Sequence, residues 1–440
     1  MMAIWSELKA VARQTPASRN RYVDFLRIVA IAAVVFGHWL MPAPYFDGQN
    51  INLDHLFNIA PWTRWLTWLF QVMPIFFFVG GYANSASWES ADRNDVAFAE
   101  WAGQRLTRLL FPLMPLILFW AMAGLATPFL QIDVGLFSEA SRLALIPVWF
   151  LAVYIMVTLV TPITYSCWSR YGVWSFWALA CGAIASDALA ILMEANWIRW
   201  ANYGFIWLAM HQLGYAWRDR YFEENARALL FFAIGAVGLA IIITVLSYPI
   251  AMVSVPGAAM SNSRPPNVAL LALGILQTAL LLLVALPVRR WLERETVWGI
   301  VIAGNRIIMT LFLWHVTVLV ACIGLSWLVG GFGLASVPGS ETWWWLRIPW
   351  LLALIVTTFA VVALLSRFEM QSKNANSAVS ATQVITGGVL ACGGLIFLAL
   401  GGIMSDTGTR ISILPFLATI SGIILILCPK LVRGYRKGKP

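Results

Sequence analysis

The sequence predicts an all-α, polytopic bundle of transmembrane helices. Of its 440 residues, 60% are hydrophobic and only 11% are charged, whereas about 25% are charged in an average soluble domain. The chain also contains 24 Trp and 25 Phe, and aromatic residues are enriched at membrane interfaces. Apolar runs of about 20 residues, the length that crosses a bilayer, recur along the chain. We therefore expect a membrane protein with about 12 spans.

The predicted spans follow one another through short connections. The first is not a cleaved signal peptide, because its apolar stretch is long and many further spans follow it. The longest connections, 42–64 and 249–267, are too short for an independent soluble domain. The predicted spans are 22–41, 65–84, 106–125, 143–163, 173–192, 198–217, 228–248, 268–287, 298–320, 343–366, 382–403 and 411–428.

Lys and Arg lie mainly on one side of these spans. If the N-terminus is cytoplasmic, 21 of the 29 Lys and Arg lie in the tails and cytoplasmic loops, and 6 lie on the opposite side. Because cytoplasmic loops are enriched in these residues, both termini are predicted to be cytoplasmic in a cell membrane. This topology and the anionic lipid of the inner leaflet account for the net charge of +9, so nucleic acid is not an expected partner.

The first predicted span carries three ionisable residues. Asp24 and Arg27 are three residues apart and can pair on a helix. His38 follows Arg27 by eleven residues, which places it about 16 Å deeper and within about 20° of the same helical face. Arg27 alone could reach the headgroups, and His38 could bond a neighbouring carbonyl. Ionisable residues within spans usually face a cavity or a pathway, however, so we expect a functional cavity here.

Five short segments of the sequence form an ordered set. They are DFLRIVAIAAVVFGH at 24–38, QRLTRLLFPLMP at 104–115, VWFLAVYIMVTLVTP at 148–162, NSRPPNVALLALG at 262–274 and GNRIIMTLFLWHVTV at 304–318. In this order they resemble the acyltransferase-3 family of integral-membrane O-acyltransferases, which carries an Arg and a His on its first span. Two details differ, because Phe312 replaces a Tyr of the family, and Asn305 and Arg306 replace an Asn-Ser pair.

The resemblance covers roughly residues 20–366. It implies a ten-helix acyltransferase core, which we place at 22–366 after a cytoplasmic N-terminal tail at 1–21. Two additional spans and a basic cytoplasmic tail make up residues 367–440. No segment of the family lies there, so truncation near residue 375 is expected to leave the catalytic residues in place.

The resemblance also implies an activity. An acyl group, usually acetyl, would move from cytoplasmic acyl-CoA to a hydroxyl of a cell-envelope glycan or glycolipid. Acyl-CoA is then a co-substrate, and we expect no permanently bound cofactor and, since the five cysteines show no ligand spacing, no metal. An alcohol needs a base to react near neutral pH, where histidine ordinarily titrates. His38 is the predicted base, and Arg27 and Asp24 complete the predicted catalytic group.

Further site residues are predicted from the later segments. Arg105 and Arg108 suit the phosphates of CoA, because a guanidinium offers bidentate donors; anchoring at the cytoplasmic surface is the alternative. His315 lies within a span. The resemblance implies that it faces the acceptor or a thioester oxygen, and structural packing is the alternative.

Three residues are assigned to the acceptor on the resemblance alone. They are Trp149, Tyr154 and Asn267, and packing is the alternative for the two aromatic residues. Asp187 and Glu194, near the outer end of the fifth span, are expected to be solvated loop carboxylates, and binding of a sugar hydroxyl on the far side is the alternative.

A protein of a different class also fits twelve spans. A transporter or lipid flippase could use Arg27 and His38 as a substrate or proton pathway. The order of the five segments favours the enzyme, because a generic transporter has no reason to display them. Transfer of label from acetyl-CoA into lipid or polysaccharide would separate the two hypotheses.

Overall fold

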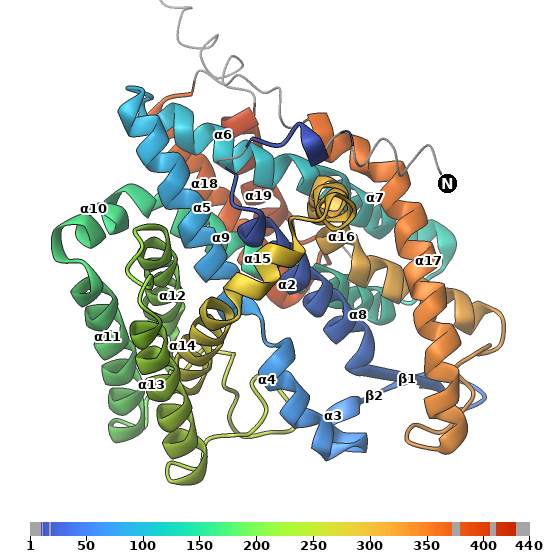
Figure 1. Cartoon of the computed structure of the whole chain (residues 1–440). Helices are drawn as coiled ribbons and strands as arrows, with labels where there is room; N and C mark the ends of the chain where they lie inside the picture. The colour runs from blue at the N-terminus through green and yellow to red at the C-terminus, as the bar shows by residue number, and fades with distance from the viewer. Residues whose placement is uncertain (1–9, 11, 17–18, 372–378, 405–410, 428–440) are drawn as a thin grey trace, which may run out of the picture. The chain divides into compact units, whose positions relative to one another are not determined.

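The computed structural model is almost entirely helical (Figure 1). It describes residues 10, 12–16, 19–371, 379–404 and 411–427. The predicted basic tail at 428–440 and residues 1–9 of the N-terminal tail lie outside the described residues. Nine helices of the described part are long and apolar enough to cross a membrane, or ten if the bent pair Val268–Leu283 and Ala285–Trp291 forms one span. The predicted all-α, polytopic helix bundle is confirmed.

Each of the twelve predicted apolar runs overlaps one or more helices, but not all form one long helix. Two shorter helices are α12 (Asn202–Arg218), with 17 residues, and α19 (Ile413–Leu427), with 15 described residues. The run at 65–84 is divided among the 3-10 helix η1 (Pro61–Leu66), α4 (Thr67–Phe70) and α5 (Met73–Arg93). Pro74 lies in the first turn of α5. The N–H groups of a first turn have no acceptor within the helix, so proline costs no hydrogen bond there.

The chain divides into two compact units, which are described separately. Unit 1 comprises Met1–Ala43, Leu53–Glu89 and Thr161–Asn305, and unit 2 comprises Pro44–Asn52, Ser90–Val160 and Arg306–Pro440. Segments far apart in the sequence therefore share each unit.

Unit 1 is built around neighbouring helices that Figure 1 shows side by side. Helix α11 packs on α12, α13 packs on α14, and α14 also contacts α11 and α12. Its elements are α2 (Arg21–Leu40), α3 (Leu56–Ile59), η1, α4, most of α5, α10 (Thr161–Tyr171), α11 (Val173–Leu192), η3 (Asn196–Ala201), α12, α13 (Asn225–Thr244), α14 (Val268–Leu283), α15 (Ala285–Trp291) and the first part of α16 (Glu295–Leu328).

Helices α5 and α12 approach each other closely through glycine. A Cβ atom on Gly81 would overlap the main-chain carbonyl of His211, and one on Gly214 would overlap that of Phe78. The same contact buries the side-chain bond between Asn84 Nδ2 and His211 Nε2, at 3.2 Å. His211 thus joins two helices, as expected for a polar residue within a bundle.

Unit 2 contains the C-terminal spans as part of its core. Helix α18 packs on α19, α9, α8 and α6, and Cys392 Sγ donates to the Ala152 carbonyl at 3.2 Å. Its elements are α6 (Phe98–Leu110), η2 (Phe111–Leu113), α7 (Met114–Leu130), α8 (Val134–Leu145), α9 (Val148–Leu159), the rest of α16, α17 (Glu341–Gln371), α18 (Ala381–Gly401) and α19. A two-stranded sheet of β1 (Pro42–Phe46) and β2 (Ile51–His55) lies at the boundary in sequence between the units.

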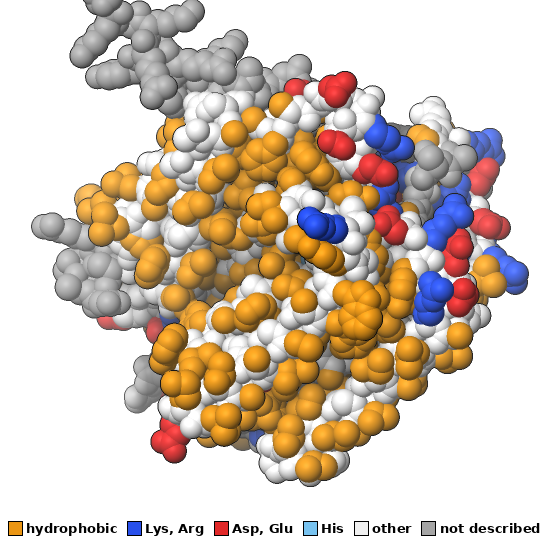
Figure 2. Space-filling model, turned by 90° about the vertical axis from the view of Figure 1, so that its left-hand side faces the viewer, with side chains coloured by type: hydrophobic (Ala, Val, Ile, Leu, Met, Phe, Trp, Pro, Cys, Tyr) orange, Lys and Arg blue, Asp and Glu red, His pale blue; other side chains and the backbone are white. Residues whose placement is uncertain are grey.

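Apolar side chains are displayed on the outside of the protein. They predominate on the face drawn in Figure 2, and charged side chains gather near its upper right edge. In unit 1 the exposed apolar residues include Trp174 and Leu192 of α11 and Val237 of α13. Lipid is the environment in which such a surface is stable, so this is a multi-pass membrane protein.

Candidate functional site

Asp24 is the buried centre of a partly buried ion-pair cluster in the first turn of α2. The side chain of Asn20 caps this helix by accepting a hydrogen bond from the N–H of Tyr22, at 3.1 Å. Asp24 is only 6% exposed, and its two carboxylate oxygens accept hydrogen bonds from Arg19 Nε at 2.6 Å and Arg27 Nη1 at 3.3 Å. The predicted pair of Asp24 and Arg27 is therefore present, and Arg19 is an additional partner.

The first part of α16 adjoins this cluster. Asn305 Nδ2 donates to the main-chain carbonyl of Asp24 at 3.2 Å and to that of Val301 at 3.0 Å. A Cβ atom on Gly304 would lie 2.8 Å from Ile28 Cδ1, so the side chain of Ile28 packs directly against the main chain of α16 here. These contacts fix the start of α16 against the charged end of α2.

His38 lies in the last turn of α2 and is half-buried. The helix is continuous from Arg27 to His38, so the eleven-residue interval corresponds to about 16 Å along the axis. Ile31 and Val34, which lie on the same face between them, are both buried. Helix α2 thus has a charged cluster at one end, an imidazole at the other and apolar side chains between.

In unit 2, His315 belongs to an aromatic cluster. It is completely buried on α16, and its Nδ1 lies 2.7 Å from the carbonyl oxygen of Phe312. Because a carbonyl only accepts, Nδ1 carries the proton in this contact, and Nε2 is the acceptor nitrogen of the neutral ring. The ring centroid of Phe312 is 5.7 Å from that of Phe150 on α9. The Phe150 centroid is in turn 6.3 Å from the ring of Trp149 and 5.8 Å from that of Tyr154. Three predicted site residues, His315, Trp149 and Tyr154, thus belong to one aromatic cluster, linked through Phe312 and Phe150.

Arg105 and Arg108 lie in the second half of α6, on side-chain positions that are not fully buried. This helix buries Trp101, Leu106 and Leu110, whereas Arg105 is half-buried and Arg108 is exposed. An exposed guanidinium is available to an anion, so the position suits the predicted contact with phosphate as well as lipid anchoring.

The predicted site residues are divided between the two units. Unit 1 contains Asp24, Arg27, His38 and Asn267, and unit 2 contains Arg105, Arg108, Trp149, Tyr154 and His315.

Asn267 is a helix cap in unit 1. It is completely buried, and its side-chain oxygen accepts from the N–H of Ala269 at 3.1 Å, which starts α14. Its amide donates to Asn262 Oδ1 at 2.9 Å, and Asn262 in turn donates to the Pro249 and Ala251 carbonyls. These bonds hold the connection between α13 and α14 in place.

Asp187 corrects one expectation from the sequence. It is only 2% exposed, so the prediction of a solvated carboxylate is wrong for Asp187, whereas Glu194 is exposed. Its neighbours are Arg199 Nε at 3.4 Å, Asn202 Nδ2 at 3.0 Å, Val268 N at 2.9 Å and the Tyr248 hydroxyl at 3.4 Å. Its position within an apolar span was a usable signal, since a carboxylate there needs partners.

The Asp187 cluster perturbs a titrating group in the connection after α13, which ends at Thr244, four residues earlier than the end of the span predicted at 228–248. Burial, together with the negative charge of Asp187, raises the pKa of the Tyr248 hydroxyl above its usual value. Both effects disfavour the phenolate. Tyr248 therefore stays protonated over a wider pH range in the folded protein.

Comparison with known proteins gives one match. A family model described as an acyltransferase domain, acyltransferase-3, matches residues 20–367. This range begins just before α2 and contains every residue named above as a predicted site residue. No curated protein and no solved structure matches the chain significantly.

Proposed function

Since this chain belongs to the acyltransferase-3 family, we propose that it transfers an acyl group, most simply acetyl, from cytoplasmic acyl-CoA to a hydroxyl of a cell-envelope glycan or glycolipid. Its general class, a membrane acyltransferase, follows from the family match and the apolar helices. The donor and the acceptor are proposals. The observation that supports them best is α2, which has the ion pair of buried Asp24 with partly exposed Arg27 at one end and His38 at the other.

His38 acts as the general base in this proposal. Its unprotonated ring nitrogen takes the proton from the acceptor hydroxyl as the oxygen attacks the thioester carbonyl. The carbon–sulfur bond then breaks, and the protonated imidazole returns the proton to the leaving CoA thiolate. The products are an ester and CoA, and His38 is restored to its neutral form. Removing a general base typically lowers a rate by on the order of 10²- to 10⁴-fold.

Arg27 orients the donor in this mechanism. Asp24 holds Arg27 through one carboxylate oxygen and Arg19 through the other, so the guanidinium of Arg27 has a restricted direction. Its remaining N–H groups can donate to a phosphate or to the pantetheine carbonyls of acyl-CoA. Arg105 and Arg108 are proposed as further donor contacts because they combine positive charge with partial exposure.

The aromatic cluster of unit 2 is proposed to support the acceptor. Trp149 and Tyr154 are only half-buried, and His315 is proposed to support them through its contact with Phe312. Partly exposed aromatic rings commonly pack against the apolar faces of sugars. Asn267 is assigned a positioning role, through its cap of α14.

The proposal includes a location and an orientation. We place the protein in a cell membrane with both termini cytoplasmic, because Lys and Arg collect on that side of the predicted spans. Acyl-CoA then approaches from the cytoplasm, at the end of α2 that carries Asp24 and Arg27. The acceptor meets the acyl group nearer His38.

Isolated membranes tested with labelled acetyl-CoA provide the decisive measurement. We expect label to enter a lipid or polysaccharide fraction as a base-labile ester, and to be absent when the membranes contain the His38→Ala protein. Longer acyl-CoA donors, tested in parallel, measure the preferred acyl length. If the full-length protein transfers none of these groups to any fraction while it transports a lipid or solute, the flippase or transporter hypothesis replaces this one.

A further inference from the structure

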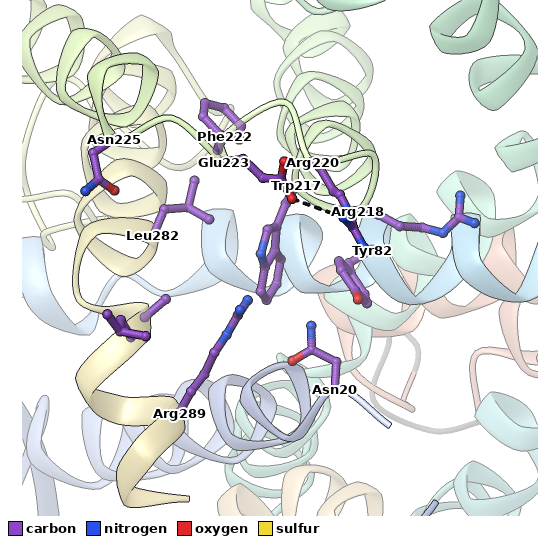
Figure 3. Close-up of a pocket in the computed structure, with 12 residues that line it drawn as sticks. Asn20, Tyr82, Trp217, Arg218, Arg220, Phe222, Glu223, Asn225, Leu282 and Arg289 are labelled. Carbon is purple, nitrogen blue, oxygen red and sulfur yellow. Dashed lines mark ion pairs between the residues drawn. The ribbon is translucent and has the colours of Figure 1, made fainter. Parts of the chain in front are cut away.

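A cavity of about 510 Å³ lies in unit 1 beside the start of α2. Its wall is assembled from the residue that caps α2, from α5, from the end of α12 and the loop to α13, and from the bent pair α14 and α15 (Figure 3). The lining residues are Asn20, Tyr82, Trp217, Arg218, Arg220, Phe222, Glu223, Asn225, Leu282, Ala285, Leu286 and Arg289. None of them was predicted as a site residue from the sequence.

The lining of this cavity is positively charged. It contains three arginines and one carboxylate, that of Glu223. Glu223 pairs with Arg220 at 3.3 Å, and both side chains are highly exposed. Arg218 has carboxylate partners in Glu89 and Asp219 and also donates to the Tyr165 hydroxyl at 2.9 Å.

Arg289 differs from the other two arginines. Its guanidinium lies 5.9 Å from the ring centroid of Tyr22, and in the described part of the chain it has no carboxylate partner. Figure 3 shows its side chain extending from α15 toward Trp217. Arg289 is therefore a cation beside an aromatic wall, with donor groups left for an anionic ligand.

The aromatic wall is well packed. Trp217 is stacked on Phe78 at 5.0 Å and lies against Tyr82 at 4.6 Å and Tyr22 at 5.9 Å. Tyr82 remains partly exposed and lines the cavity with Trp217. Such a surface suits a flat aromatic group, whereas the arginines suit phosphate.

We propose that this cavity binds the nucleotide end of the acyl-CoA donor, with a phosphate on Arg289 and the base against Tyr82 and Trp217. The inference rests on the proposed function for the identity of the donor. An anionic lipid headgroup would share the phosphate but not the base, and the aromatic wall favours the nucleotide. From Tyr22, which lies under Arg289, to His38 is sixteen residues of α2, or about 24 Å. The long pantetheine arm of CoA suits a reacting group that lies far from the nucleotide.

Two neighbouring arginines allow a matched test of the cation. Arg289 lines the cavity, and Arg290 is the next residue of α15, is also exposed and does not line it. Binding of CoA to the purified full-length protein is measured by calorimetry in detergent. We expect Arg289→Ala to weaken binding by on the order of tenfold, the value of a charge-assisted hydrogen bond, and Arg290→Ala to bind CoA as the parent does. Equal binding by both variants, or equal loss in both, overturns the proposal.

Two neighbouring glutamates test whether removing a negative charge from the cavity lining strengthens CoA binding. Glu223 lines the cavity, whereas Glu224 pairs with Arg227 outside it. Glu223→Gln removes the carboxylate of the lining and releases Arg220, so it should tighten CoA binding by roughly two- to fivefold. Glu224→Gln should leave binding unchanged. Weaker binding by Glu223→Gln would contradict an anion site.

Competition identifies the source of the phosphate. Adenosine 3′,5′-bisphosphate should displace labelled CoA from the parent protein, and pantetheine, which lacks the nucleotide, should not. Displacement by short-chain phosphatidylglycerol but not by the bisphosphate would assign the cavity to lipid and overturn the proposal. CoA binding that depends on Arg289 but leads to no acyl transfer would leave the cavity assignment intact and refute the proposed function. If the protein transfers acyl groups but Arg289→Ala and Arg290→Ala do not differ in CoA binding or in KM, the proposed function stands and the cavity assignment is refuted.

Discussion

Asn305 donates a hydrogen bond from its side-chain amide to the main-chain carbonyl of Asp24, at 3.2 Å. The contact joins α16 to the first turn of α2, where Asp24 also holds Arg19 and Arg27. The charged end of α2 is thus supported from two directions, by ion pairs on the side chain of Asp24 and by a hydrogen bond on its main chain.

Replacing His38 should abolish acyl transfer. If its ring takes the proton of the acceptor, His38→Ala should lower the rate by on the order of 10²- to 10⁴-fold at an unchanged amount of inserted protein. Loss of one polar side chain from a span should not impair insertion. The measurement is the initial rate of label transfer in membranes matched for protein content.

His55→Asn is the control for His38. His55 caps α3 by accepting from the N–H of Phe57 at 3.3 Å, and Asn is also a good cap. This variant should transfer at the parental rate. A His38→Ala protein as active as His55→Asn would leave His38 with a packing role.

Arg27→Ala should chiefly raise the KM for acyl-CoA, because Arg27 is proposed to hold the donor and not to move a proton. Arg27→Lys should recover only part of the affinity, since an ammonium cannot reproduce the guanidinium fork. Arg19→Ala removes the other partner of Asp24 and is the matched comparison. Equal effects of Arg19→Ala and Arg27→Ala on KM would mean that both act only through Asp24.

The C-terminal spans should be required for a stable unit 2. A Cβ atom on Gly388 of α18 would lie 2.7 Å from Leu159 Cδ1 and 3.3 Å from Leu106 Cδ2. Gly388→Leu should therefore lower the free energy of unfolding by about 1–3 kcal/mol through overpacking. Gly393→Leu, on the same helix, meets no atom within 4 Å and should have little effect. Thermal denaturation in detergent compares the two variants.

Truncation near residue 375 tests the same contacts more severely. The sequence suggests that catalytic residues remain in place, but the packing of α18 on α6, α8 and α9 suggests that the shortened protein loses stability. Removal of 428–440 alone is the control. A truncated protein that melts at the parental temperature would contradict the structural role of α18.

Tyr248 should make stability depend on alkaline pH. Its pKa is raised in the folded protein by burial and by Asp187, so its contribution is complete below the unfolded pKa of about 10. The contribution is lost as the pH rises through the folded-state pKa. Tyr248→Phe should remove this component, and the difference in melting temperature between parent and variant should shrink above about pH 10. A constant difference at all pH values would mean that Tyr248 contributes by packing alone.

Both termini should be cytoplasmic. A C-terminal reporter that is active only outside the membrane should be inactive when fused to the full-length chain, because 21 of the 29 Lys and Arg lie on the predicted cytoplasmic side. The same reporter fused after residue 192, at the predicted outer end of the fifth span, should be active. Activity of the C-terminal fusion would refute the orientation.

The helices could be predicted from the sequence because apolar length alone identifies a span. The break between α4 and α5 could not, because the chain there contacts a distant segment: the Gln71 side chain donates to the Met252 carbonyl at 2.9 Å. The Asp24 and Arg27 pair could be predicted from its spacing on one helix. Asp187 could not be recognised as the centre of a cluster, since its partners come from three other segments of the chain.

The cavity was hidden from sequence analysis for a similar reason. Its residues come from four separate stretches of the sequence, at 20, 82, 217–225 and 282–289, and no single stretch contains both the aromatic wall and Arg289. Arg289 was counted only among the Lys and Arg that set the topology. Its contact with the ring of Tyr22 exists only in the folded chain.

The glycine contact between α5 and α12 determines how a ligand can enter this cavity. Tyr82 and Trp217 are contributed by these two helices, and their backbones touch at Gly81 and Gly214. That side of the cavity cannot widen without breaking a contact between main chains, so we expect it to be rigid. The loop of Arg220 and Glu223, whose side chains are highly exposed, lines another part of the cavity. We therefore expect an incoming molecule to pass that loop and not to separate α5 from α12.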